Sequence, residues 1–128
     1  MYQAQQHYRA LSIASRIEAA SPHELVAILY EELLRSLDVT RTALAQGKAD
    51  ACRSARERSS SILLALEASL DFERGGELAR NLGQIYRSMQ KEIAASVQAG
   101  DAASLEIVRS SVADLLSAWA RIGVREAA

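Results

Sequence analysis

The sequence contains few of the residues that crosslink a fold, break helices or bind metals. Its 128 residues include one cysteine, one proline, one tryptophan, one phenylalanine and two histidines. A lone Cys52 excludes an intramolecular disulfide framework and favours a reducing compartment. No apolar run has the length of a signal-peptide core, and none approaches the roughly 20 residues of a membrane span. We therefore expect a cytoplasmic protein without membrane insertion.

The sequence also lacks an excess of charge of either sign. Lysine and arginine total 15 and aspartate and glutamate total 16, which gives a formal net charge of -1. Arg53, Arg56 and Arg58 form a short basic run, but Glu57 interrupts it and no aromatic residue lies within it. A solvated helix face accounts for such a run better than a nucleic-acid site does. We expect no nucleic-acid partner.

Residues that could support catalysis or bind a cofactor are equally scarce. A metal site inside a helical bundle needs Glu-x-x-His pairs, and no glutamate here is followed three residues later by histidine. His7 and His23 lie outside the predicted core and Cys52 has no histidine nearby in sequence, so we predict a packing or surface role for that thiol. Gly75-Gly76 lacks any phosphate-loop fingerprint. These features predict no catalytic residue, metal or cofactor, and argue against a bundle enzyme or metalloprotein.

The abundant residues favour helices. Hydrophobic residues make up 49% of the chain, and they recur at three- and four-residue spacings without strand-like alternation. Ser21-Pro22-His23-Glu24 is a capping box that begins a helix. Gly47 and Gly100 are expected to end helices in the left-handed conformation. Asp50 and Asp101 are candidate N-caps of the helices that follow. The predicted helices cover residues 21–46, 50–70, 77–99 and 101–123, with a loop at 71–76.

Short connections between amphipathic helices predict antiparallel neighbours. The expected fold is all-α, an up-down-up-down four-helix bundle over residues 21–123. Residues 1–20 have scattered apolar anchors and form a flexible N-terminal segment or docking cap, and residues 124–128 form a short tail. In the third helix the spacing places Leu78, Leu82, Ile85, Tyr86 and Met89 inside. The fourth helix has the most regular apolar face, which consists of Leu105, Val108, Val112, Leu115, Trp119 and Ile122.

Several apolar or small residues fall beside or opposite the core-facing apolar stripe of their helix. When about 100° is allowed for each residue, the projection places Ile28 and Leu34 beside the first stripe, and Leu64 and Ile107 off their own stripes. Ala79, Gly83 and Tyr86 form a flank of the third helix. Gly83 costs a helix about 1 kcal/mol relative to alanine, which a close approach of another backbone would justify. This excess of apolar surface modestly favours a groove for a protein partner over an imperfect bundle surface.

Three stretches of the sequence resemble the FliS family of flagellar secretion chaperones. They are Ala20 to Leu25 with Leu29-Tyr30-Glu31 and Leu33, then Leu70 to Leu82 with Ile85-Tyr86 and Met89, and Ala118 to Ile122 around Trp119. Tyr8 also lies where the family tends to have an aromatic. Two positions depart from the family pattern: Glu31-Glu32 replaces an aspartate and a small residue, and Arg87-Ser88 replaces an aspartate and an aromatic.

The resemblance implies a cytoplasmic export chaperone. FliS-like proteins bind the disordered C-terminal segment of flagellin, prevent its premature polymerisation and present it to the type III export apparatus. An export-gate subunit, an anti-sigma factor or a co-chaperone are further possible partners, and a monomer or weak dimer is expected. Tyr8 and Ile13 would cover the groove until the client arrives. The residues expected to contact the partner are Tyr8, Ile13, Ile28, Leu29, Leu34, Leu64, Ala79, Asn81, Leu82, Gly83, Tyr86 and Met89. A passive bundle that self-associates through its extra apolar surface is the alternative.

Overall fold

The computed structural model describes residues 12–127, with side-chain surroundings through residue 122. Four long helices account for most of this range: α2 (Pro22–Ala45), α3 (Ala49–Ala68), α4 (Phe72–Ala99) and α5 (Ala102–Ala127). A shorter helix covers residues 12–19. Strands are absent from residues 12–127, so the prediction of an all-helical chain is confirmed.

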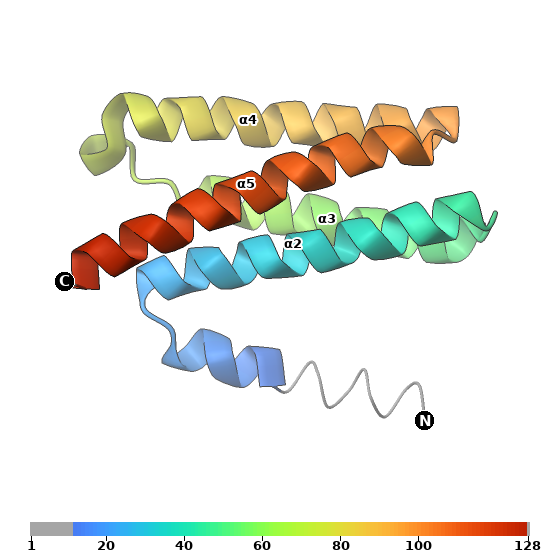
Figure 1. Ribbon diagram of the computed structural model, residues 1–128. Helices are drawn as coiled ribbons and strands as arrows, with labels where there is room; N and C mark the ends of the chain where they lie inside the picture. The colour runs from blue at the N-terminus through green and yellow to red at the C-terminus, as the bar shows by residue number, and fades with distance from the viewer. Residues whose placement is uncertain (1–11, 128) are drawn as a thin grey trace.

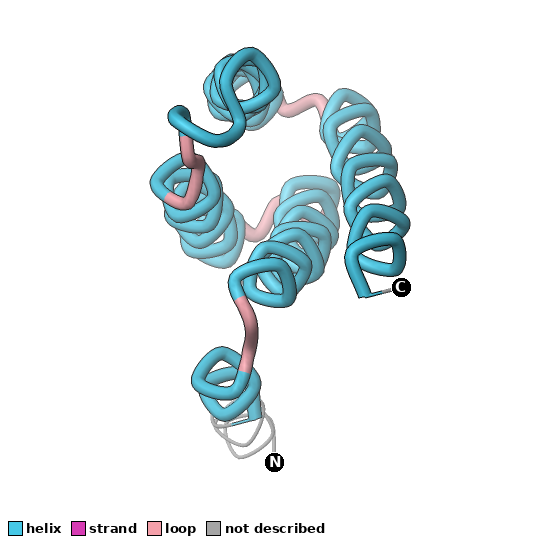
Figure 2. The backbone as a smooth tube through the Cα atoms, turned by 90° about the vertical axis from the view of Figure 1, so that its left-hand side faces the viewer, coloured by secondary structure: helices cyan, strands magenta, loops and turns pink. Residues whose placement is uncertain are grey.

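The long helices surround one core. α2 packs against α3 and α5, and α4 packs against the same two helices from the other side. Successive helices run in opposite directions, and the view along their axes shows them arranged as a ring (Figures 1 and 2). The contacts of α4 with its neighbours are sparser than those of α2. The two walls that α4 forms, with α3 and with α5, are therefore equally sparse and less tightly closed than the wall between α2 and α3.

The helix ends follow the predicted capping chemistry with one exception. The Ser21 hydroxyl accepts a hydrogen bond from the Glu24 amide at 3.2 Å, and Gly100 ends α4 in the left-handed conformation at φ 68°. The Asp101 carboxylate accepts a hydrogen bond from the Ser104 amide at the start of α5. Asp50, however, is not a cap, because α3 begins one residue before it and its N-cap is Lys48, which makes no side-chain capping bond.

The start of α4 differs from the prediction of a loop over 71–76. The Asp71 carboxylate accepts hydrogen bonds from the amides of Glu73 and Arg74, so helical structure already begins at Phe72. Gly76 then adopts φ 49° and ψ -122°, a conformation that favours glycine, and kinks the helix. The local capping chemistry of Asp71 thus converts most of the expected loop into a helical turn joined to α4 through a kink.

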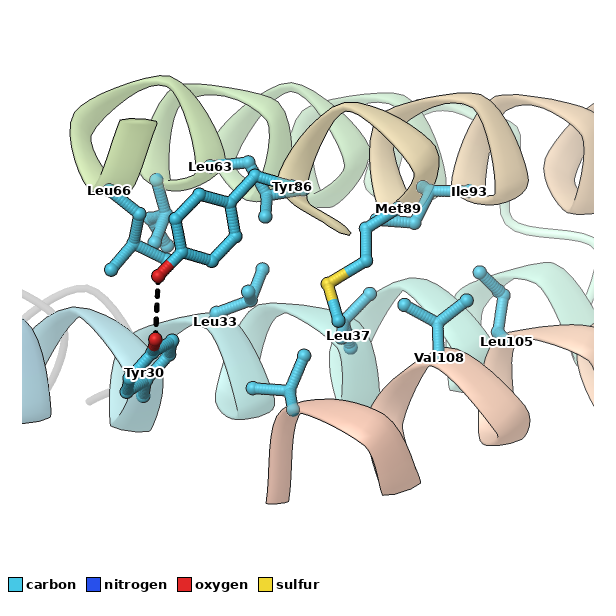
Figure 3. Close-up of a cluster of buried hydrophobic side chains, with 12 residues drawn as sticks. Tyr30, Leu33, Leu37, Leu63, Leu66, Tyr86, Met89, Ile93, Leu105 and Val108 are labelled. Atoms are coloured by element: carbon cyan, nitrogen blue, oxygen red, sulfur yellow. Dashed lines mark hydrogen bonds between the residues drawn. The ribbon is translucent and has the colours of Figure 1, made fainter. Parts of the chain in front are cut away.

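The core runs the length of the ring and is mostly aliphatic. Figure 3 shows side chains from all four long helices meeting at its centre, among them Leu33 and Leu37 of α2, Leu63 of α3, Met89 of α4 and Val108 of α5. Each of these five is at most 3% exposed. Burying a side chain of this size contributes about 1.5–3 kcal/mol, so the long helices are held mainly by this shared interior.

Polar side chains join α2 to α3 within the core. The hydroxyls of Ser36 and Ser59, both buried, lie 2.7 Å apart in a hydrogen bond. About one helical turn earlier on α2, the buried Glu32 carboxylate accepts a hydrogen bond from the Arg58 guanidinium at 3.0 Å. The Arg35 side chain lies 3.5 Å from the same carboxylate. Arg58 therefore neutralises Glu32, which belongs to one of the two stretches at which the sequence departs from the family pattern.

The N-terminal segment contains helical structure, which the sequence did not predict. Residues 12–19 form a helix whose Arg16 side chain lies 3.0 Å from Glu31 of α2. This helix lies beside α2, on the side away from α4 (Figures 1 and 2). At the other terminus, α5 extends to Ala127, through most of the range expected to be a tail.

Candidate partner-binding groove

A groove of about 800 Å³ runs between α4 and α5. Its volume lies within the usual range for ligand sites in proteins. The lining residues of α4 repeat on one helical face, and those of α5 face them across the sparsely packed wall of the ring. They are Asn81, Gln84, Ile85, Ser88, Met89 and Glu92 of α4, with Ser111, Asp114 and Leu115 of α5.

The floor of this groove is apolar and its edges are polar. Met89 is 3% exposed and belongs to the core, whereas Ile85 is 39% exposed and presents its side chain to solvent. Leu115 is half-buried against the core from the opposite helix. The only ionisable lining residues are Glu92 and Asp114, which make no ion pair within residues 12–127. The arrangement suits an amphipathic segment that buries apolar side chains and keeps polar ones at the rim.

Exposed apolar side chains extend the groove toward one end of the molecule. Leu78, one helical turn before the groove on α4, is 60% exposed, and Ile122 near the end of α5 is 39% exposed. Because the two helices are antiparallel, the first half of α4 and the second half of α5 lie at the same end of the ring (Figure 1). A contiguous run of exposed apolar residues marks an interaction surface more often than isolated ones do.

Beneath this end, aromatic side chains tie three helices together. The Tyr30 and Tyr86 hydroxyls, from α2 and α4, form a buried hydrogen bond of 2.6 Å across the core (Figure 3). The Trp119 indole N–H donates to the His23 carbonyl at 2.9 Å, and the two rings stack at 4.5 Å with planes 8° apart. Tyr30 meets Trp119 edge-on. His23 is thus half-buried in a stack, whereas the sequence indicated a solvated or capping histidine.

Burial sets the protonation of the tyrosine pair. Burial raises the pKa of Tyr86 well above its ordinary value, and its hydrogen bond with Tyr30 raises it further. Burial also raises the pKa of Tyr30, although its hydrogen bond with Tyr86 opposes the shift. Both hydroxyls therefore remain neutral donors and acceptors at physiological pH, and they hold the inner side of α4 in place.

The groove brings together only part of the predicted partner-binding set. Asn81 and Met89 line it. Leu29, Leu34 and Leu82 are half-buried and pack against the core. Leu64 is 58% exposed, which confirms its position off the α3 stripe, but α3 does not contribute to the groove. Ile107, at 69% exposed, is likewise off its stripe and outside the groove.

Other predicted positions are buried and present no open surface. Ile28 is 5% exposed, Ala79 4% and Tyr86 2%. Gly83 is buried too, and a Cβ there would meet Arg87 Nη1 at 3.3 Å, so the expected approach of another backbone is replaced by the Arg87 side chain. In the folded chain these residues complete the interior behind α4 and present no open flank, and the burial of Tyr86 confirms the prediction that it lies inside.

The N-terminal residues do not cover the groove within the described range. Ile13 is half-buried on the helix of residues 12–19, which lies against α2 rather than over α4 and α5 (Figure 2). Tyr8 lies outside the described residues. The predicted cover is therefore not formed by residues 12–19.

Sequence reasoning missed most of the groove lining. Ile85 and Leu115 were both predicted to lie on the core side of their helices. Ser88 was predicted only as a departure from the family pattern, and Ser111 had no predicted role. One sequence signal could have indicated the groove. On each of two consecutive antiparallel helices, an apolar residue has small or polar residues beside it on the same face. Metal-binding clusters of acidic, histidine or cysteine residues are absent from residues 12–127. None of the described helices is both long and apolar enough to cross a membrane.

Comparison with known proteins agrees with the resemblance in the sequence. The family model described as Flagellar protein FliS matches residues 4–126. The flagellar secretion chaperone FliS of Salmonella typhimurium is 32% identical over 116 residues, which cover 90% of this chain and 86% of that protein. Its namesake from Vibrio cholerae is 30% identical over 117 residues, which cover 91% and 86%. The flagellar secretion chaperone FliSB of Pseudomonas aeruginosa is 28% identical over 116 residues, which cover 91% and 92%.

Proposed function

Because this chain belongs to the FliS family of flagellar secretion chaperones, we propose that it binds the disordered C-terminal segment of flagellin in the groove between α4 and α5. By covering that segment it prevents premature polymerisation in the bacterial cytosol, and it delivers the client to the type III export apparatus. The chain acts by binding and performs no catalysis.

The observation that supports this proposal is the exposed apolar lining of the α4–α5 groove. A disordered amphipathic segment can fold as a helix into such a groove and bury its apolar face. Ile85 and Leu115 offer apolar contact from opposite walls, while Asn81, Gln84 and Ser88 offer hydrogen-bonding groups at the edge. α4 has sparse contacts with both of its neighbours, so it can adjust to a client without disrupting the tight α2–α3 interface.

The energetics suit a chaperone that must later release its client. Ordering a disordered segment on binding costs about 2–5 kcal/mol or more of the interaction energy, so affinity is modest for the area buried. Burial of apolar area provides the driving force, and the polar rim selects the orientation. A large but moderately tight interface prevents self-association of the client and still permits transfer.

We also propose that the functional unit is the antiparallel four-helix bundle of residues 21–123. The ring of long helices supplies a rigid support, because the α2–α3 wall is fixed by the Ser36–Ser59 and Glu32–Arg58 pairs. An export-gate subunit, an anti-sigma factor or a co-chaperone remain further partners expected from the resemblance, with the chain acting as a monomer or weak dimer.

Isothermal titration calorimetry with intact and truncated flagellin tests the function. We expect a one-to-one complex with the intact client and no measurable heat when the C-terminal segment is removed. Equal binding of both forms would show that the segment is not the ligand. Self-association without any response to flagellin would favour the passive bundle instead.

A pair of matched variants tests the location. Ile85→Asp places a charge on the groove wall, and Leu64→Asp makes the same change at an exposed apolar residue of α3. We expect Ile85→Asp to weaken flagellin binding by about tenfold or more, since binding would bury an unpaired carboxylate. Leu64→Asp should leave the affinity within about twofold, as expected for a residue outside the interface. Circular dichroism shows whether both variants remain folded.

A further inference from the structure

A second, smaller cavity opens at the end of the molecule that carries the α2–α3 turn (Figure 1). It has a volume of about 320 Å³ and shares no lining residue with the α4–α5 groove. The last turns of α2, the first turns of α3 and one residue of α4 surround it. Its lining residues are Ala43, Leu44, Gly47, Lys48, Ala49, Cys52, Arg53, Arg56 and Val97.

The floor of this cavity is apolar. Cys52 is 4% exposed, and Leu44 and Val97 are half-buried against the main core. The turn that frames the mouth passes through Gly47, whose φ of 69° allows the chain to reverse without a side chain over the opening. The cavity is therefore large enough, and apolar enough at its base, to accept one apolar side chain from outside.

The rim has charge of one sign only. Lys48, Arg53 and Arg56 line the opening, and the lining contains no carboxylate. Cys52, Arg53 and Arg56 have the spacing of one helical face, which orients both guanidinium groups to the side on which the cavity lies. Asp50 lies 3.6 Å from Arg53 but is 97% exposed, so water screens that pair strongly.

Few carboxylates of the protein itself pair with the cations at the rim of the cavity. Lys48 and Arg56 make no ion pair with the side chains described in residues 12–122, and Arg58, the next cation of the run, is paired with Glu32. The first turn of α3, which borders the cavity through Ala49, has no side-chain cap and adds its positive dipole end to the same potential. Three cations therefore surround an apolar cavity in a chain with a net charge of -1, and among them only Arg53 has an ion pair, which is highly exposed.

A nucleic acid fits this site poorly. Nucleic-acid surfaces present a basic stripe with many phosphate contacts, often with aromatic side chains for stacking. Here three cations surround a small concave site, and none of its lining residues is aromatic. The combination of an apolar base and a basic rim matches a peptide that carries an apolar anchor between carboxylates.

We propose that this cavity docks an acidic segment of a second protein partner, with one apolar side chain against Leu44, Cys52 and Val97 and flanking carboxylates on Lys48, Arg53 and Arg56. The site is independent of the flagellin groove, because the two cavities have no residue in common. Both can be occupied at once, so the chaperone can carry its client and contact another protein at the opposite end.

Nuclear magnetic resonance of the isotope-labelled full chain tests this site. The probe is an acetylated, amidated pentapeptide with a phenylalanine between two pairs of aspartates. One control peptide replaces the phenylalanine with alanine, a second replaces the aspartates with lysines, and a short single-stranded oligonucleotide is the third control. We expect saturable shifts of the Gly47, Ala49 and Cys52 amides at millimolar concentrations of the acidic peptide.

Two protein variants with equal charge change complete the test. The triple variant K48Q/R53Q/R56Q should weaken the acidic peptide by about tenfold, as three partly screened ion contacts predict. The triple variant R74Q/R80Q/R121Q removes three exposed cations outside the cavity and should change the affinity by no more than about twofold.

Three results would overturn the proposal: no shift at these amides, equal weakening by both triple variants, or equal or stronger shifts with the lysine peptide or the oligonucleotide. Loss of the effect with the alanine peptide is expected, because burial of the phenylalanine supplies the apolar part of the binding. None of these measurements uses flagellin, so their outcome is separate from that of the client groove.

Discussion

Removing one hydroxyl from the Tyr30–Tyr86 pair tests how α4 is held against α2. Each tyrosine is at most 2% exposed, and each hydroxyl has the other as its hydrogen-bond partner at 2.6 Å. Tyr86→Phe leaves the Tyr30 hydroxyl buried without that partner. A buried hydroxyl with no hydrogen-bond partner lowers the free energy of unfolding by about 1–3 kcal/mol. We expect Tyr30→Phe to cost a similar amount, since the bond is lost from the other side.

The double variant separates the hydrogen bond from the packing of the rings. Tyr30→Phe with Tyr86→Phe removes both polar groups and keeps both rings, so its free energy of unfolding should lie within about 1 kcal/mol of the wild type. The two single changes are therefore strongly non-additive, as groups in one hydrogen-bonded pair usually are. The sum of the two single losses should exceed the loss in the double variant by more than about 1 kcal/mol.

Urea denaturation followed by circular dichroism measures all four proteins. A loss of 1 kcal/mol should also lower the melting temperature by roughly 4 °C in a domain of this size. Single variants as stable as the wild type would refute the reasoning, because the hydroxyls would then be satisfied in some other way. Additive losses would show that each hydroxyl contributes independently, and not through the hydrogen bond that joins them.

Three further predictions follow from contacts of the same helices. Burial raises the pKa of Tyr86, so its contribution to stability is complete below the unfolded value of about 10 and is lost as the pH rises above it; urea midpoints measured across alkaline pH should fall in the wild type and fall less in Tyr86→Phe. Gly83→Ala should change the free energy of unfolding by less than about 1 kcal/mol, because a helix-propensity gain of about 1 kcal/mol offsets displacement of the exposed Arg87 side chain; a loss above about 2 kcal/mol in urea would show that glycine is required there. Trp119→Phe removes the hydrogen bond to the His23 carbonyl and part of the ring stack, and should cost about 1–2 kcal/mol in the same assay, with no loss if the stack is incidental.

The sequence was sufficient to predict features that depend on neighbouring residues. Ser21 and Asp101 cap their helices as expected, and Gly100 ends α4 in the left-handed conformation. Such signals are readable because each partner lies within a few residues of the cap. The regular spacing of Leu105, Val108 and Val112 likewise identified a buried stripe, and all three are at most 1% exposed.

The candidate groove depended on contacts between distant helices and was predicted poorly. Leu78 and Ile85 belong to an apolar repeat and were expected inside, yet they are 60% and 39% exposed. α4 packs sparsely against both α3 and α5, and this packing between distant segments is not encoded in a local pattern. Tyr86 was predicted both inside the bundle and at the edge of the groove, and its 2% exposure confirms the first prediction. A hydroxyl 56 residues away in the sequence satisfies its polar group in the core.

The partners of charged residues also could not be predicted from neighbouring residues in the sequence. Glu32 lies on the inner side of α2 because Arg58 and Arg35 neutralise it, and Arg58 is 26 residues away. Arg87, the other departure from the family pattern, lies 2.9 Å from Glu67 of α3. Each departure brings a charge with a specific partner, and only the folded arrangement reveals the pairing.

The most direct test of the proposed function is a methyl NMR titration of the full chain with the C-terminal segment of flagellin. We predict that the methyl signals of Ile85, Met89 and Leu115 shift in a saturable manner, because the segment folds onto the α4–α5 groove that they line. The methyl signals of Leu64 and Ile107, which are exposed outside that groove, should remain unchanged. Shifts confined to Leu64 and Ile107, with none at Ile85 and Leu115, would contradict the account.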